Sequence, residues 1–136
     1  MNSKKLRLNF LFLCDHILIE ENKKISVIGI FNIINLKEVP GTYVKFVLVG
    51  NFSILDKKVK DLNVKVNLVD PNGKPVALPV PLIKLPAAPK GKKLKDVNFY
   101  LEFNNLKFES EGEYKFEMLV NKEFLGTYKF QVKHKK

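Results

Sequence analysis

Residues 62–73 read LNVKVNLVDPNG, and this short stretch shows the pattern from which the fold of much of the chain is predicted. Apolar side chains occupy every second position from Leu62 to Leu68, while asparagine and lysine fill the positions between them. This period of two predicts a β-strand with one apolar and one polar face. The strand ends in a predicted turn, where Pro71 stands at a type I turn position and Gly73 where a left-handed residue is needed.

The same alternation recurs further along the chain and predicts three more strands. Residues 97–103, 114–120 and 128–132 each carry an apolar row that is opposed by a polar row. No stretch of useful length keeps a helical period. One apolar and one wetted face on each strand is the pattern of an antiparallel sheet packed against a second sheet. We therefore expect an all-β chain.

The N-terminal half is more apolar, and its predicted strands at 6–14, 25–36 and 43–54 carry apolar residues on both faces. In the first of them, the expected core-facing row comprises Leu6, Leu8, Phe10, Phe12 and Cys14. Strands of this kind are either covered on both sides or part of an interface. Nearly all aromatic residues fall on apolar rows. Tyr100 is the exception, so we expect no platform of exposed rings.

Two local patterns place these strands in a particular kind of sandwich. Gly112 and Tyr114 resemble the tyrosine corner of immunoglobulin-like sandwiches, where the phenol hydroxyl bonds back to upstream backbone. Six of the seven prolines lie between 71 and 89, so the proline-rich loop at 79–95 is expected to be a sheet edge or an extended crossover. We predict a single antiparallel β-sandwich over residues 1–136, immunoglobulin-like or Greek key, with about seven or eight strands and a basic tail at 133–136.

Composition limits the kinds of protein to which the chain can belong. The chain has 136 residues, of which 46% are hydrophobic and 28% charged, as expected for one globular domain with its own core. Its single cysteine, Cys14, excludes an intrachain disulfide. Arg7 and Asn9 interrupt the apolar N-terminal stretch and no small-residue cleavage site follows, so we expect neither a signal peptide nor a membrane span. The sequence therefore predicts a cytoplasmic protein.

The positive charge is concentrated in a few segments. The formal net charge is +10, and three segments without acidic residues, at 1–14, 84–95 and 129–136, hold 12 of the 24 basic residues. Such segments attract anionic partners. Arg7 is the single arginine, however, and lysine reads nucleic-acid sequence poorly because it lacks the bidentate guanidinium. Solubility alone also accounts for a lysine-rich surface.

Residues with catalytic or metal-binding chemistry are few. Cys14 and His16 share one face of an extended strand, but no oxyanion site accompanies them, so we expect a buried, inert cysteine. With His134 they make only three metal ligands, whereas structural zinc needs four. The three glutamates at 109–113 flank a turn and are expected to be solvated. The sequence predicts no enzyme activity, no cofactor and no metal.

Several segments together resemble a known family. They are Asn9–His16, Lys24–Asn32, Leu68–Lys74, Leu106–Phe116 and Leu125-Gly126. In these segments the chain is similar to a family of small bacterial β-sandwich proteins known only as a domain of unknown function. The resemblance covers most of the chain and implies a stand-alone cytosolic protein with no assigned activity. The loop at 79–95 and the basic tail depart from the family pattern.

We therefore expect a non-enzymatic protein-interaction or structural module. The length and charge of the proline-rich loop single it out, and the residues expected to contact a partner are Lys84, Lys90, Lys92, Lys93 and Lys95. The partner is an unknown protein or a second copy, because an uncovered sheet face or edge allows self-association. The alternative is a non-specific nucleic-acid or polyanion binder that uses the loop and both termini, which a steep salt dependence of affinity distinguishes.

Overall fold

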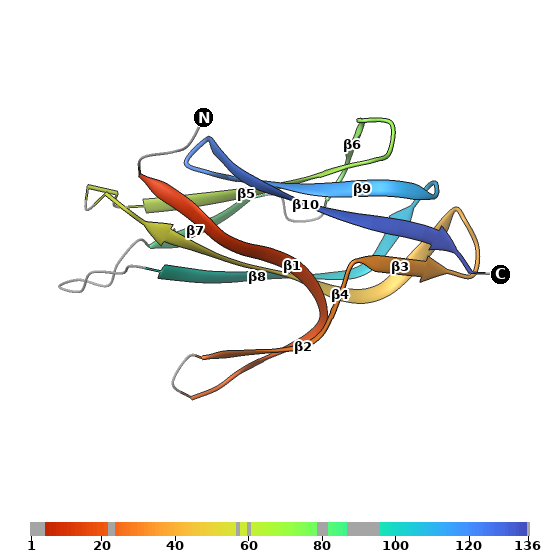
Figure 1. Cartoon of the computed structure of the whole chain (residues 1–136), viewed down its shortest axis with the longest axis horizontal. Helices are drawn as coiled ribbons and strands as arrows, with labels where there is room; N and C mark the ends of the chain where they lie inside the picture. The colour runs from red at the N-terminus through yellow and green to blue at the C-terminus, as the bar shows by residue number, and fades with distance from the viewer. Residues whose placement is uncertain are drawn as a thin grey trace.

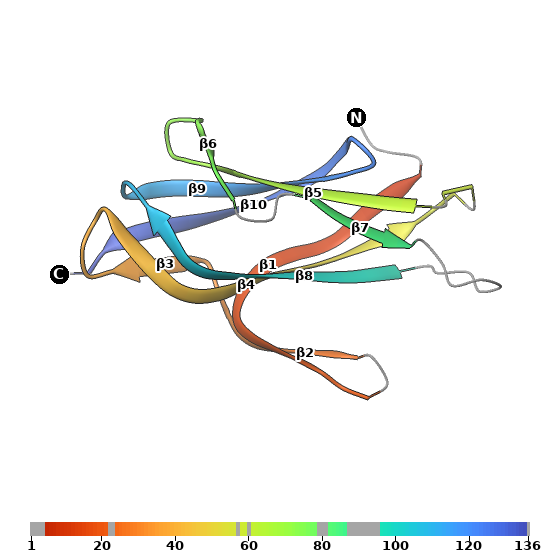
Figure 2. The same cartoon turned by 180° about the vertical axis from the view of Figure 1, so that it is seen from behind.

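Strands make up most of the chain, which is an all-β structure (Figure 1, and from behind in Figure 2). The computed structural model describes residues 5–21, 24–56, 58–59, 61–78 and 96–135, together with the backbone of 82–86. The described residues form the strands β1 (Leu6–Ile19), β2 (Ile25–Phe31), β3 (Ile33–Leu36), β4 (Gly41–Ile54), β5 (Asp61–Val69), β6 (Pro75–Val76), β7 (Leu82–Pro86), β8 (Asp96–Phe108), β9 (Gly112–Val120) and β10 (Glu123–His134). This part of the chain contains no helix long and apolar enough to cross a membrane.

The strands form two sheets that pack face to face. The four-stranded sheet has the order β2-β1-β4-β8, and its pairs are antiparallel. The six-stranded sheet has the order β3-β10-β9-β5-β6, with β7 paired to β5 as well. Figure 1 shows the two layers, with β9 and β10 on one side and β1, β4 and β8 on the other. The predicted all-β sandwich is therefore confirmed.

The stretch 25–36 forms two strands, although its pattern predicts one. At Asn32 the chain passes from the four-stranded sheet to the six-stranded sheet. The carbonyl of Asn32 accepts a 2.8 Å hydrogen bond from the amide of Gln131 in β10. The β3–β10 pair that follows runs parallel, whereas an antiparallel sandwich was predicted. The described residues form ten strands, where about seven or eight were expected. Residues 25–36 thus supply an outer strand to each sheet.

The proline-rich region lies at a sheet edge, as expected for a segment with few backbone donors. The turn before it takes the predicted form, because the amide of Gly73 donates a 3.0 Å bond to the carbonyl of Asp70 and its φ is 81°. β6 and β7 then pair with β5, on the side that β9 leaves open. Residues 79–81 and 87–95 lie outside the described residues.

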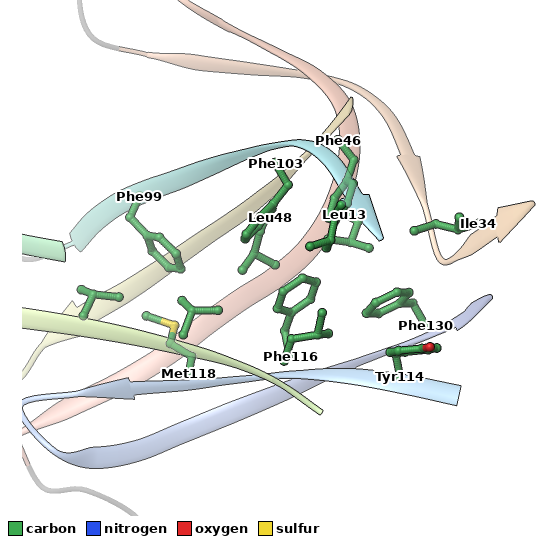
Figure 3. Close-up of a cluster of buried hydrophobic side chains, with 14 of the residues drawn as sticks. Leu13, Ile34, Phe46, Leu48, Phe99, Phe103, Tyr114, Phe116, Met118 and Phe130 are labelled. Atoms are coloured by element: carbon green, nitrogen blue, oxygen red, sulfur yellow. The ribbon is translucent and has the colours of Figure 1, made fainter. Parts of the chain in front are cut away.

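Aromatic side chains of both sheets meet in the core between them (Figure 3). Phe46 and Phe103 of the four-stranded sheet stack with their ring centroids 5.1 Å apart. Phe103 stacks on Phe116 of the facing sheet at 5.5 Å, and Phe116 stacks on Phe130 at 5.4 Å. All four rings are buried. The apolar rows predicted at 97–103, 114–120 and 128–132 therefore face this core.

Tyr114 forms the predicted tyrosine corner. Its hydroxyl donates a 2.9 Å hydrogen bond to the carbonyl oxygen of Ser110, four residues upstream. Its ring packs edge-on against Phe108, with centroids 5.1 Å apart, and stacks on Phe130 at 5.8 Å. The corner thus ties the connection between β8 and β9 to the end of the core.

Candidate interaction surfaces

A β-bulge at Asn9 changes which side chains of β1 face the core. Leu8 lies opposite Phe52 of β4, whereas Phe10 lies opposite Asn51, so Asn9 is an extra residue in the ladder. Side chains alternate between the two faces of a sheet, and one inserted residue therefore reverses the alternation of every residue that follows. The bulge decides the surface chemistry of the four-stranded sheet.

The core-facing row predicted for the first strand is therefore wrong after Leu8. Leu11 and Leu13 pack on the core between the sheets, although the sequence pattern assigns them to the opposite row. Phe10, by contrast, is 42% exposed on the outer face. Cys14 is buried but belongs to a separate cluster. The physical reason is the inserted residue, because an uninterrupted period of two holds only while the ladder is regular.

The outward side chains of β1, β4 and β8 form a surface that we name the aromatic face. The strand registers place them in the rows Arg7–Ser53–Asp96, Phe10–Asn51–Asn98, Phe12–Val49–Tyr100 and Cys14–Val47–Glu102. Tyr100 is 43% exposed, about as much as Phe10. The ring centroids of Phe10 and Phe12 lie 5.1 Å apart. Tyr100, expected to be alone on the polar face, shares that face with two further rings, because the bulge turns them outward.

A network of side-chain hydrogen bonds orders one end of the aromatic face. The amide nitrogen of Asn9 donates to Oδ1 of Asn51 at 2.7 Å and to Oγ of Ser53 at 2.8 Å. The amide of Asn51 donates to Oδ1 of Asn98 at 2.6 Å. The hydroxyl of Ser53 donates to Oδ1 of Asp96 at 2.6 Å. The network links β1, β4 and β8, so these side chains hold defined positions before any partner binds.

Charges of both signs lie at the opposite end of the face. The Nζ atom of Lys45 lies 3.2 Å from Oε1 of Glu102 and 3.2 Å from Nδ1 of His16. Hydrogen bonds from Asn104 and from Lys45 lower the pKa of the Glu102 carboxyl below its ordinary value. The row Arg7–Ser53–Asp96 adds one cation and one anion to the face. The aromatic face is therefore nearly neutral, in contrast to the chain as a whole.

A small second core lies on the outer side of the four-stranded sheet. Cys14, Val47 and Val49 are buried there, and Ile17 and Val27 of the β1–β2 hairpin pack against them. Both views show this hairpin extending away from the sandwich, on the side opposite the six-stranded sheet (Figure 1 and Figure 2). The second core thus anchors the hairpin to the body of the protein.

The side chains of the cysteine and histidine singled out in the sequence have different partners. Burial, together with the charge of Asp15, raises the pKa of the Cys14 thiol. Its Sγ atom lies 3.5 Å from the backbone carbonyl of His16, and the ring of His16 contacts Lys45. A thiol with a raised pKa is a poor nucleophile, because the thiolate is the reactive form.

The residues weighed as metal ligands or carboxylate pairs are also dispersed. Nε2 of His134 lies 2.8 Å from the carbonyl oxygen of Lys37, and its backbone amide donates a 2.7 Å bond to Glu111. Within the described ranges, no three His, Cys, Asp or Glu side chains gather closely enough to hold a metal ion. An open groove of about 590 Å³ runs along residues 35–38 and 41–45, and Glu38 is the one acidic residue in its lining.

The β1–β2 hairpin carries the most apolar exposed surface of the described chain. Half of the ten exposed large hydrophobic residues lie on it or at its base, namely Leu18, Ile19, Ile28, Ile30 and Ile33. Ile30 is the most exposed of them, at 64%. The sequence pattern predicted apolar residues on both faces of this region. It had no signal for the hairpin's position outside the sandwich.

The lysines predicted to contact a partner lie mostly outside the described residues. These are Lys90, Lys92, Lys93 and Lys95. The backbone of Lys84 lies in β7, opposite Asn63 of β5. Their role in binding stays a prediction.

Comparison with solved structures shows a recurrent fold. The alkylpurine DNA glycosylase AlkC of Pseudomonas fluorescens, bound to DNA containing an abasic site analog, matches 96% of this chain with a TM-score of 0.57 and 15% identity. A β-glucosidase of Listeria innocua matches 95% with a TM-score of 0.53 and 11% identity. This chain spans only 31% and 16% of those two chains. An immunoglobulin-like protein of Pseudomonas aeruginosa matches end to end, covering 96% of this chain and 99% of its own, with a TM-score of 0.42 and 13% identity.

At such identities the likeness concerns the fold alone, which is a β-sandwich. No curated protein matches the chain. The model of a family of unknown function, DUF6941, matches residues 9–133. The resemblance found in the sequence is thereby confirmed, and the chain belongs to the family of unknown function DUF6941.

Proposed function

We propose that this chain is a non-enzymatic protein-interaction module that binds its partner on the aromatic face. The observation that carries the proposal is the pair of half-exposed rings, Phe10 and Tyr100, beside an ordered polar network on one sheet face. Aromatic residues and arginine are enriched at the centres of protein interfaces, where a polar rim surrounds them. The aromatic face has this composition, with Arg7 in its first row.

The exposed parts of the rings set the scale of the affinity that they supply. Full burial of a phenylalanine is worth about 1.5–3 kcal/mol, so covering the exposed 42% of Phe10 is worth about 1 kcal/mol. Tyr100, at 43%, contributes a similar amount, and ring contacts with a partner add about 0.5–1.5 kcal/mol. Loss of either ring therefore lowers affinity by at least about tenfold.

The charge of the face supports a protein partner over a polyanion. Arg7 and Lys45 are matched there by Asp96 and Glu102, so a polyanion gains little attraction. The segment 84–95 joins directly to Asp96 in the sequence. In our proposal its lysines, Lys84, Lys90, Lys92, Lys93 and Lys95, contact acidic residues at the rim of the bound partner.

The test is capture of host-lysate proteins on the immobilised chain, followed by mass spectrometry. The variants are Phe10→Ala and Tyr100→Ala, and the control is Phe124→Ala, which removes a ring 54% exposed at the start of β10. We expect one discrete partner that resists nuclease, is retained by the control and is lost by both face variants. Circular dichroism confirms that each variant is folded. The same captured proteins on all four chains contradict the proposal.

The salt dependence of the affinity and a charge-reversal variant distinguish the alternative function, polyanion binding, from the proposed one. A polyanion binder that neutralises about five phosphates loses affinity steeply as salt rises, whereas binding through aromatic rings responds weakly. Exchange of Lys90, Lys92 and Lys93 for glutamate is expected to weaken binding of the protein partner. The salt dependence of the remaining affinity is expected to stay shallow. Capture dominated by nuclease-sensitive ribosomal or nucleoid proteins, with a steep salt dependence, favours the polyanion binder.

A further inference from the structure

β2 has one paired and one open side. In the part of the chain that the structure describes, β2 pairs with β1 alone, and it ends the four-stranded sheet. The amide of Glu20 donates a 2.9 Å bond to the carbonyl of Lys24, so the backbone groups of Lys24 face β1. Because these groups alternate along an antiparallel strand, those of Ile25 and Val27 point away from β1. They form a row of donors and acceptors at the open side.

The open side lacks the features by which sheet edges usually avoid pairing. Natural edge strands carry lysine, proline or inward-pointing charges. β2 reads ISVIGIF from Ile25 to Phe31, with no charged residue and no proline. Its one irregularity is Gly29, whose φ of 73° bends the strand where the side chain of Asp15 lies against it. The hairpin also carries four of the ten exposed large hydrophobic side chains of the described residues.

We propose that β2 pairs antiparallel with β2 of a second copy of this chain. The two four-stranded sheets then join across a two-fold axis into one sheet of eight strands. The pairing uses a different surface from the aromatic face, and it does not depend on the function proposed above. In the resulting dimer each copy keeps its own aromatic face.

The charge of the hairpin selects a second copy as the occupant. The whole chain carries a formal charge of +10, so two copies repel over most of their surfaces. Residues 15–31 hold three carboxylates, Asp15, Glu20 and Glu21, against two lysines, a formal net charge of −1. This segment is thus a place where two copies meet with little repulsion. Antiparallel self-pairing of β2 also sets uncharged residues against one another over its whole length.

The size of the interface predicts a weak, concentration-dependent dimer. A strand of seven residues from each copy, with the exposed parts of Ile28 and Ile30, places it at the lower end of specific interfaces. We expect a dissociation constant of about 1–100 µM.

The experiment is sedimentation equilibrium of the full chain from about 2 µM to about 500 µM. The average mass is expected to rise from 15.7 kDa toward twice that value. Ile30→Lys places a charge on β2 at a side chain that is 64% exposed, and we expect it to raise the dissociation constant at least tenfold. The control is Val44→Lys, which adds the same charge at a residue of β4 that is 73% exposed, and we expect it to leave the dimer intact.

A second variant tests the backbone pairing itself. Val27→Pro removes an amide that points to the open side, and it leaves the ladder with β1 complete. We expect a folded monomer, with folding checked by circular dichroism. Should Val27→Pro not fold, Ile30→Lys and its control decide alone. A monomeric wild type at the highest concentration, or a dimer that both hairpin variants leave unchanged, overturns the proposal. The Tyr100→Ala chain stays dimeric if the two surfaces are separate, so failure of one proposal is distinguishable from failure of the other.

Discussion

Replacement of Tyr114 by phenylalanine isolates the contribution of the tyrosine corner. The ring keeps its packing against Phe108 and Phe130, and only the hydroxyl is lost. That hydroxyl donates a 2.9 Å bond to the carbonyl of Ser110, a half-buried residue. A hydrogen bond of this kind contributes a net 0.5–1.5 kcal/mol, and a partly buried carbonyl left without its donor adds to the loss, so we expect destabilisation of about 1–2 kcal/mol.

Urea unfolding monitored by circular dichroism measures this change. The matched control is Tyr100→Phe, which removes the same atom from a ring that is 43% exposed, and we expect it to change stability by less than about 0.5 kcal/mol. For a chain of this length, the loss at Tyr114 corresponds to a fall in Tm of about 5 °C. Equal stability of the two variants would refute the structural role of the corner. A change in the urea dependence of unfolding would show that the substitution also altered the compactness of the native or denatured state.

Two further predictions follow from the pKa shifts. Because burial and then the charge of Asp15 raise the pKa of Cys14, we expect Ellman's reagent to modify the folded chain at least about 100-fold more slowly than the urea-unfolded chain; equal rates would contradict the burial of the thiol. The pKa of Glu102 is lowered by hydrogen bonds from Asn104 and Lys45, so its stabilising effect is present above the unfolded-state pKa and fades as pH falls through the folded-state value. Lys45→Met is expected to raise the pKa of Glu102 in a carboxyl NMR titration, and an unchanged titration would exclude Lys45 as a cause.

The regular parts of the fold were predictable because their information is local. The alternation from Leu62 to Leu68 needs nothing beyond the strand itself to separate an apolar from a polar face. The spacing of Gly112 and Tyr114 likewise predicts a corner whose hydrogen bond spans only four residues. The left-handed glycine of the turn at 70–73 is of the same kind. Each of these predictions is confirmed by the structure.

The candidate surfaces were not predictable in this way. Phe10 and Phe12 keep an uninterrupted apolar alternation with Leu6 and Leu8, and a single strand shows no sign that Asn9 is a bulge. The insertion exists only relative to β4, where Asn51 and Ser53 accept hydrogen bonds from Asn9. The aromatic face therefore depends on contacts more than 40 positions apart in the sequence.

The sequence by itself determined the strand-forming segments, the sandwich class and the family, since side-chain period and turn residues act over a few neighbouring positions. Tertiary structure alone decided three further features. They are the outward turn of Phe10, the passage between sheets at Asn32 and the exposed side of β2. The first is set by the register of β1 against β4, where a shift of one residue exchanges the buried and exposed faces without changing a letter of the local pattern. The other two are set by which strands pair, and pairing partners lie far apart in the sequence.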